Sequence, residues 1–427
     1  MSTHSRRCSR AIATSCTALA MLATSATSAS ATSRVSISYY YPIGVSGPLA
    51  TIMDNLVASF NKSHPTIHVT PVFSGNYLDT LDKLEAAIAA GNPPAVAVVN
   101  HTAEFDLHHL NAVLPLDSVA QTGDYYSTLL QPRIGGHIWG IPFQRSTVVL
   151  YYNKTAFAKA GLNPNNPPQT RAQLVADAKA LQKAGYTGIE VPTGGTGTNY
   201  WQFQPFVVSF GQNLVGTNGT TVYFNSPAAK NALNFWMALS HTYHVEPTGL
   251  LPWQDVPGDF ESGKVGMIVH SSGSMAAILK DSHFSVGVAF MPKGGGKYRT
   301  VLGGGDMYLI KGTSASQRAA GLTFIKWMTA PAQAVNWSIS TGYVPTSPKD
   351  LTLPNWKSYV AKTPQASVPV SQLPYAAIEM STYQLTRVTD LIDSAIDSVV
   401  DGSTAVNNAL NSAENQANSI LAPYRHT

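Results

Sequence analysis

The feature that most constrains this 427-residue chain is a regular alternation of strand-like and helix-like segments in its first quarter. Residues 35–41 and 66–73 are β-branched and aromatic runs, typical of strands. Between them, apolar residues recur over 49–60 with the spacing of one helix face. Residues 78–88 repeat that helical spacing, and residues 95–99 form a continuous apolar run. This β-α-β-α-β order predicts parallel strands in an α/β fold.

The alternation continues through the rest of the chain. Further strands are expected at residues 188–192, 265–269, 285–291 and 306–310, and further helices at residues 172–184, 228–239 and 317–328. The last stretch, residues 376–421, has an almost entirely helical pattern. These elements predict two linked units with parallel sheets and no flexible linker. In such sheets ligands gather at the carboxyl ends of strands, here the loops that begin at Pro42, Gly75 and Asn100.

The first 31 residues have the composition of an export signal. Three arginines precede an apolar stretch at residues 11–26, and residues 29–31 match an A-x-A cleavage site. The apolar stretch is too short and too rich in Ser and Thr for a membrane span. We expect a signal peptide over residues 1–31 and a periplasmic or extracellular mature protein. A lipid anchor at Cys16 is the less favoured alternative, because much of the apolar stretch follows that cysteine.

Removing that segment changes the charge balance. The whole chain carries 27 basic and 23 acidic residues. Without the first 31 residues, which hold three arginines and no acid, 24 basic and 23 acidic residues remain, a formal charge of +1. Near-neutrality argues against nucleic acid as a partner. Both cysteines also lie in the segment, so the mature chain has no thiol for a disulfide or a Cys-based metal site.

No motif for catalysis stands out. The sequence lacks a G-x-S-x-G nucleophile motif. The spacing of His101, His108 and His109 fits no standard set of metal ligands. Asp79 and Asp82 lie three residues apart on one face of an expected helix, as solvated surface charges do. We therefore expect a binding protein that is not an enzyme and uses no metal or cofactor.

Two segments carry candidate ligand contacts. Residues 194–201 form a Gly-rich loop that ends in Tyr200 and Trp201, which would suit stacking on a sugar or polyol. A turn followed by core aromatics is the equally favoured alternative. Residues 271–274, Ser-Ser-Gly-Ser, follow a strand directly and begin a helix. Free N–H groups and hydroxyls at that point would suit an anion, and plain N-capping is the alternative.

Five short segments stand in an informative order. They are Ser74–Tyr77, Gly91–Ala95, Leu150–Lys154, Ser271–Ser274 and Thr341–Pro345. This set resembles the extracellular solute-binding proteins of ABC importers, over nearly the whole chain that follows the signal. The Tyr-Tyr-Asn-Lys motif is typical of the family. Gly-Asn-Tyr and Ser-Ser-Gly-Ser are similar to its glycerophosphate-binding branch.

The resemblance implies an architecture and partners. The fold would be periplasmic-binding-protein-like, of type II, with two α/β lobes, a hinge and a ligand cleft between the lobes. Lobe 1 would comprise residues 32–147 and 290–341, and lobe 2 residues 148–289 and 342–427. Binding of a small-molecule ligand would close the lobes. The permease subunits of the ABC importer would recognise the closed form of a monomeric receptor.

The resemblance also implies ligand contacts. Tyr77 would contact the glycerol moiety, and Ser146 and Ser271 would donate hydrogen bonds to the phosphate. Gly304 would offer a backbone N–H where a side chain would block approach. Tyr343 would add a phenol donor. These five positions form the core of the expected site.

Five further positions complete the expected site. Arg387 would pair with the phosphate as a charged fork. His101 stands where the family has a carboxylate; a neutral imidazole accepts only one hydrogen bond and titrates near neutral pH, so affinity would depend on pH. Arg145 and Asp306 replace small polar residues. They would pair with each other or read a different head group, such as that of a zwitterionic glycerophosphodiester. Trp201 is an additional candidate.

These features predict an extracytoplasmic solute receptor of an ABC importer. Its ligand would be sn-glycerol-3-phosphate or a glycerophosphodiester, delivered to the membrane permease. A receptor for a neutral sugar or polyol is the alternative, favoured by His101 and by the aromatic pair Tyr200 and Trp201.

Overall fold

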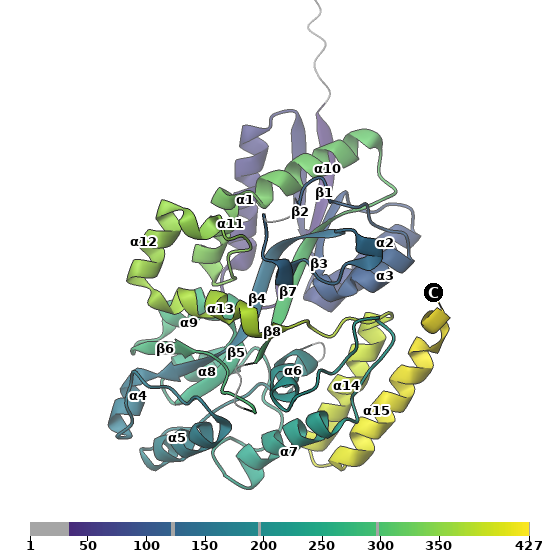
Figure 1. Ribbon diagram of the computed structural model, residues 1–427. Helices are drawn as coiled ribbons and strands as arrows, with labels where there is room; N and C mark the ends of the chain where they lie inside the picture. Colours follow the sequence, from purple (N-terminus) through teal and green to yellow (C-terminus); the bar gives the residue numbers. More distant parts are fainter. Residues whose placement is uncertain (1–33, 121–123, 195–197, 296–298, 427) are drawn as a thin grey trace, which may run out of the picture. The chain divides into compact units, whose positions relative to one another are not determined.

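The computed structural model describes residues 34–120, 124–194, 198–295 and 299–426 (Figure 1). The expected signal peptide, its cleavage site and Cys16 lie outside these residues, as do residues 195–197 of the Gly-rich loop. None of the helices within the described ranges combines the length and the apolarity that a membrane crossing requires.

The first five elements follow the predicted order. They are β1 (Val35–Tyr41), α1 (Leu49–Ser63), β2 (Ile67–Phe73), α2 (Tyr77–Ala89) and β3 (Val96–Asn100). β1 lies between β2 and β3 and pairs with both in parallel, as predicted. α1 buries Leu49, Met53, Val57 and Phe60, the apolar face that the spacing indicated. Every residue of β3 is buried, which confirms a strand covered on both faces.

The sheet then continues with antiparallel neighbours, in the order β2-β1-β3-β7-β4-β5. β7 (Thr300–Leu309) pairs antiparallel with β3 and with β4 (Gly140–Asn153). β4 also pairs antiparallel with β5 (Met267–Ser271) and β6 (Val286–Ala289). The prediction of parallel pairing was therefore wrong for β4, β5, β6 and the pairing of β7 with β3 and β4. Among these strands β4 was not predicted, because its polar centre interrupts any apolar pattern although all its residues are buried.

β4 and β7 lie side by side in the middle of the sheet (Figure 1). The first part of β4 pairs with β7 as far as Thr147, opposite Leu302. From Val148 onward β4 pairs with β5 and β6. The strand thus changes partners between Thr147 and Val148. The lobe boundaries given above stay a prediction.

The helices between β3 and β8 (Ala376–Ala377) pack on this sheet or on one another. They are α3 (Glu104–His109), α4 (Lys154–Lys159), α5 (Arg171–Lys183), α6 (Asn199–Ser209), α7 (Pro227–His241), α8 (Val256–Glu261), α9 (Met275–Asp281), α10 (Ala315–Met328), α11 (Pro331–Thr341), α12 (Pro354–Lys362) and α13 (Ser367–Gln372). The helices predicted at residues 172–184, 228–239 and 317–328 are confirmed as α5, α7 and α10. Residues 188–192 form isolated bridges rather than the predicted strand. The main core lies between the sheet and α1, α6, α7, α10, α14 (Leu385–Val400) and α15 (Val406–Leu421).

The C-terminal stretch is less helical than predicted. β8 (Ala376–Ala377) pairs in parallel with β7, and residues 378–384 are irregular. α14 (Leu385–Val400) and α15 (Val406–Leu421) follow. The carboxylate of Asp106 accepts hydrogen bonds from the N–H groups of Gln384 and Leu385, at 2.7 and 2.8 Å, and so satisfies donors at the start of α14. A tertiary contact, and no local sequence pattern, sets this helix start.

The tight pairing of β4 and β7 generates a prediction at Gly304. Gly304 has a φ of +88°, and a Cβ there would lie 1.6 Å from the carbonyl oxygen of Gln144. Gly91 has a φ of +72° with no atom within 4 Å of such a Cβ. Gly91→Ala should therefore cost only the backbone penalty of about 1–2 kcal/mol. Gly304→Ala should cost about 1–3 kcal/mol more, because it overpacks a buried strand pair. Urea unfolding of both variants measures the difference; equal losses would refute the clash.

Candidate ligand-binding site

A cavity of about 290 Å³ lies where several strands end. It is bordered by the turn after β1, the start of α2 and the ends of β3 and β5. The start of α6, the loop before α8, the turn after α11 and the segment after β8 also border it, as do Ser146 of β4 and Gly304 of β7. Its polar and aromatic lining residues are Asn76, Tyr77, Asn100, Ser146, Thr198, Tyr200, Trp201, Trp253, Gln254, Ser271, Tyr343 and Glu379.

Two indoles form a corner of the cavity. The rings of Trp201 and Trp253 meet edge to face, with centroids 5.8 Å apart. Trp201 Nε1 donates to the carbonyl oxygen of Leu302 at 2.8 Å, and Trp253 Nε1 donates to that of Gly44 at 3.0 Å. Because both indole N–H groups are already used, the rings can offer the cavity only carbon and π surface, and one face of Trp253 is already stacked on His270, with centroids 3.9 Å apart. Such surfaces suit the C–H faces of a polyol or a cationic group.

Hydroxyl groups line other parts of the cavity. The hydroxyls of Tyr77 and Tyr343 lie 3.1 Å apart, and that of Tyr77 donates to Gln144 Oε1 at 3.3 Å. Ser146 projects from β4 and Ser271 ends β5. Ser271 Oγ accepts from the Gly273 N–H at 3.0 Å, so this serine does cap the following turn. Its own hydroxyl proton remains available to a ligand.

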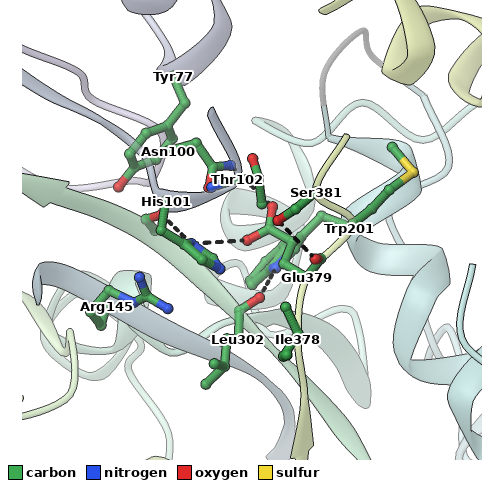
Figure 2. A network of polar contacts seen from close by, with 12 residues as sticks. Tyr77, Asn100, His101, Thr102, Arg145, Trp201, Leu302, Ile378, Glu379 and Ser381 are labelled. Atoms are coloured by element: carbon green, nitrogen blue, oxygen red, sulfur yellow. Dashed lines mark hydrogen bonds and ion pairs between the residues drawn. The ribbon is translucent and has the colours of Figure 1, made fainter. Parts of the chain in front are cut away.

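Glu379 is the acidic group of the cavity. It lies in the irregular segment after β8 and is 1% exposed. Its Oε1 accepts hydrogen bonds from Asn100 Nδ2 at 3.0 Å and from the Tyr200 hydroxyl at 2.7 Å. Its Oε2 has no hydrogen-bond partner and lies 3.6 Å from His101 Nδ1 (Figure 2). Burial raises the pKa of Glu379 to about 7, against the lowering effect of these two hydrogen bonds and of Arg145.

The charge balance of the lining is one-sided. Among the described residues that line the cavity, Glu379 is the sole acid, and no Lys or Arg is present. Negative charge on a ligand would therefore meet hydroxyl and amide donors but no cationic side chain. The described residues also contain no group of three or more His, Cys, Asp or Glu side chains placed to hold a metal ion.

His101 is fully buried and is not among the residues that line the cavity. Its Nδ1 is 3.1 Å from the carbonyl oxygen of Gly304. Because a carbonyl only accepts, we assign the proton to Nδ1. Burial and the charge of Arg145 lower the pKa of His101 well below its usual range. The prediction that His101 titrates near neutral pH was therefore wrong. The neighbouring group whose pKa is about 7 is Glu379.

Arg145 and Asp306 form a buried ion pair. They come from the paired strands β4 and β7, and Arg145 Nη1 lies 2.8 Å from Asp306 Oδ1. Both side chains are buried, and neither lines the cavity. These residues were expected either to pair with each other or to read a different head group. In the structure they pair with each other. The Nε and Nη2 groups of Arg145 have no hydrogen-bond partner.

Arg387 lies apart from the cavity. It is exposed on the first turn of α14, and its Nη1 donates to Gln384 Oε1 at 3.2 Å. Arg387 is therefore not placed to contact a phosphate bound in this cavity. The predicted residues that do meet at the cavity are Tyr77, Ser146, Trp201, Ser271, Gly304 and Tyr343.

Sequence reasoning missed several lining residues. Asn100 marked the start of a named loop but was given no role, and Trp253 belonged to no recognised element. Glu379 lies in a segment whose pattern indicated a helix. No local feature marks Glu379; only its contacts with Asn100 and Tyr200, distant in sequence, show that it is buried at the cavity.

Comparisons with known proteins give a family. Residues 55–364 match the family described as bacterial extracellular solute-binding protein. The sn-glycerol-3-phosphate-binding periplasmic protein UgpB of Pectobacterium atrosepticum is 27% identical over 380 residues, which cover 84% of this chain and 83% of that protein. The protein of the same name from Salmonella typhimurium is 27% identical over 390 residues, covering 84% of each chain.

Solved structures share the fold. UgpB from Mycobacterium tuberculosis in complex with glycerophosphocholine aligns with a TM-score of 0.80 at 22% identity, covering 92% of this chain and 99% of that one. Maltose-bound MalE3 of T. maritima also aligns with a TM-score of 0.80 at 22% identity, covering 90% and 100%. The chain therefore has the mixed α/β fold of these binding proteins, as expected.

The raised pKa of Glu379 generates a prediction about stability. Because folding raises this pKa from 4.5 to about 7, the stability linked to Glu379 is fully present below pH 4.5 and is lost as pH rises through 7. Gln at this position keeps an oxygen acceptor for Asn100 and Tyr200 but cannot ionise. The melting temperature of Glu379→Gln relative to the wild type should therefore rise between about pH 5 and about pH 8. Thermal melts monitored by circular dichroism measure it.

Glu190 provides the matched control. It is buried, its pKa is also raised to about 7, and it does not line the cavity. Glu190→Gln should shift melting with pH in the same direction. A pH-independent melting difference for Glu379→Gln would show that this carboxylate is not desolvated.

Proposed function

Because the chain belongs to the family of bacterial extracellular solute-binding proteins, we propose that it is the receptor of an ABC importer for a glycerophosphate ligand. The ligand is sn-glycerol-3-phosphate or a glycerophosphodiester, and the receptor delivers it to the membrane permease. The single observation that carries the proposal is the cavity, which combines apolar indole surfaces with clustered hydroxyl donors.

The glycerol moiety suits the aromatic side of the cavity. Its C–H groups would pack on Trp201 and Trp253, whose N–H groups are already bonded elsewhere. The hydroxyls of Tyr77 and Tyr343 lie close enough for one ligand hydroxyl to bridge them. Two of the relatives named above are called sn-glycerol-3-phosphate-binding proteins, which supports this choice of ligand.

The phosphate would be held by neutral donors. Ser146 and Ser271 present hydroxyls from the neighbouring strands β4 and β5. Hydrogen bonds to a charged group contribute about 1.5–3 kcal/mol each, so a few such donors hold a phosphate without a salt bridge. The glycerophosphocholine complex of the M. tuberculosis protein supports a phosphodiester as the second form of the ligand.

A neutral sugar or polyol is the second candidate. The specific observation in its favour is that no Lys or Arg stands among the described lining residues. The maltose-bound neighbour shows that the same fold accommodates a neutral sugar in that protein. Under either ligand the chain acts as a receptor, and we propose that it catalyses no reaction.

The cellular setting follows from the same proposal. Residues 1–31 would direct export and be removed, leaving a monomeric receptor on the outer side of the cytoplasmic membrane. The permease subunits of the importer would be its protein partners.

Titration calorimetry on residues 32–427 tests the ligand class. We expect saturable heat with sn-glycerol-3-phosphate or glycerophosphocholine and none with maltose or ribitol. Heat with maltose or ribitol alone would replace the glycerophosphate proposal by the neutral-ligand candidate.

Two variants test where the phosphate lies. Ser146→Ala removes a hydroxyl from the cavity and should weaken glycerophosphate binding by about tenfold or more, as the loss of a hydrogen bond to a charged group does. Arg387→Ala serves as its matched control and should leave affinity within about twofold, the scale of a surface substitution. Calorimetry gives both constants. The reverse pattern would place the phosphate at Arg387 and overturn the assignment of this cavity.

A further inference from the structure

Glu379 is the one charged side chain among the described residues that line the cavity, and half of its carboxylate is unsatisfied. Oε1 is saturated by Asn100 and Tyr200, which fix the carboxylate in place. Oε2 is buried with no hydrogen-bond partner. Oε2 has almost no accessible surface, so a ligand group does not reach it directly, but an ionised carboxylate in a buried site still attracts a positive charge several ångströms away. The lining thus favours a positive charge on the ligand.

Neighbouring groups do not neutralise Glu379. From the element after β3, His101 faces it at 3.6 Å but gives its Nδ1 proton to Gly304 and is held neutral by burial. From β4, the guanidinium of Arg145 is already paired with Asp306 of β7. From α3, Glu104 is a further buried acid near that pair. From α6, only the neutral Tyr200 reaches the carboxylate. The ionised carboxylate therefore leaves an uncompensated negative charge.

Aromatic rings surround the same cavity. Tyr77, Tyr200, Trp201, Trp253 and Tyr343 all line it. One face of Trp253 is stacked on His270, and one face of Tyr343 on Trp337. A cation over the remaining ring surface is attracted through the ring quadrupoles, and a carboxylate among the rings adds a direct charge interaction. By contrast, a phosphate monoester, which carries close to two negative charges at neutral pH, would meet repulsion from Glu379.

We propose that Glu379 is the specificity-determining residue of this cavity, selecting glycerophosphodiesters with a cationic head group over sn-glycerol-3-phosphate. The assignment rests on the proposed function of the same cavity and narrows its ligand class. The carboxylate and the surrounding rings receive the cationic head group, while the serine hydroxyls receive the singly charged phosphodiester.

The test compares three ligands that differ in charge. They are glycerophosphocholine, sn-glycerol-3-phosphate, and glycerophosphoglycerol, a diester without a cation. The proteins are the wild type, Glu379→Gln and Glu190→Gln, studied by calorimetry at about pH 8, where a group with a pKa of about 7 is ionised. Glu379 also borders a second cavity, of about 310 Å³. Glu379→Gln keeps a side chain of similar volume between the two cavities. A melting curve and the binding stoichiometry report the folded fraction of each variant.

We expect the wild type to prefer glycerophosphocholine over each of the other two ligands by about tenfold or more, the scale of one charge interaction. Glu379→Gln should reduce that preference by about tenfold, with weaker binding of the cationic diester and tighter binding of the monoester. Glu190→Gln should keep the wild-type ratio. A merely structural role of Glu379 would weaken all three ligands alike.

Two outcomes overturn the inference in different ways. If the ligands bind but Glu379→Gln leaves the preference for glycerophosphocholine unchanged, the role of Glu379 is refuted and the proposed function stands. Binding of none of the three by the folded wild type refutes the proposed function, and the role of Glu379 with it.

Discussion

The antiparallel pairing of β4 with β7 is the constraint on which the candidate site depends. Gly304 lies opposite Arg145 in this pairing, and a side chain at residue 304 would collide with the carbonyl oxygen of Gln144. With no side chain there, the strands approach closely enough to bury the ion pair of Arg145 and Asp306. The same glycine offers its carbonyl oxygen to His101, whose ring lies against the carboxylate of Glu379. Strand pairing thus fixes the floor of the cavity.

Electrostatics then decides what the cavity accepts. The cation nearest the floor, Arg145, is paired with Asp306, and breaking such a buried pair is costly. The described lining residues therefore include no free positive charge. An anionic group has to be held locally by hydroxyls such as those of Ser146 and Ser271. The unsatisfied oxygen of Glu379 adds a preference for positive charge.

Local patterns predicted the parts of this fold that depend on local physics. The strands β1 to β3 and helices such as α1 and α10 have clear periodicities, and they were placed correctly. β4 escaped because Gln144, Arg145 and Ser146 are polar residues buried by pairing with a strand about 160 residues away, as the ion pair of Arg145 with Asp306 illustrates. Glu379 escaped because its burial depends on Asn100 and Tyr200 rather than on its neighbours. Six predicted contacts do meet at the cavity, whereas Arg387 lies on the surface. Local patterns thus identified several residues of the cavity, but not the contacts between residues that are far apart in the sequence.

The most direct test of the account is a crystal structure of residues 32–427 with glycerophosphocholine bound. The account predicts the ligand in the cavity beside Trp201 and Trp253, with its phosphate oxygens within hydrogen-bond distance of the Ser146 hydroxyl. Its cationic head group should lie next to the carboxylate of Glu379. A ligand bound outside this cavity, or one whose phosphate contacts Arg387 while its head group lies away from Glu379, would contradict it.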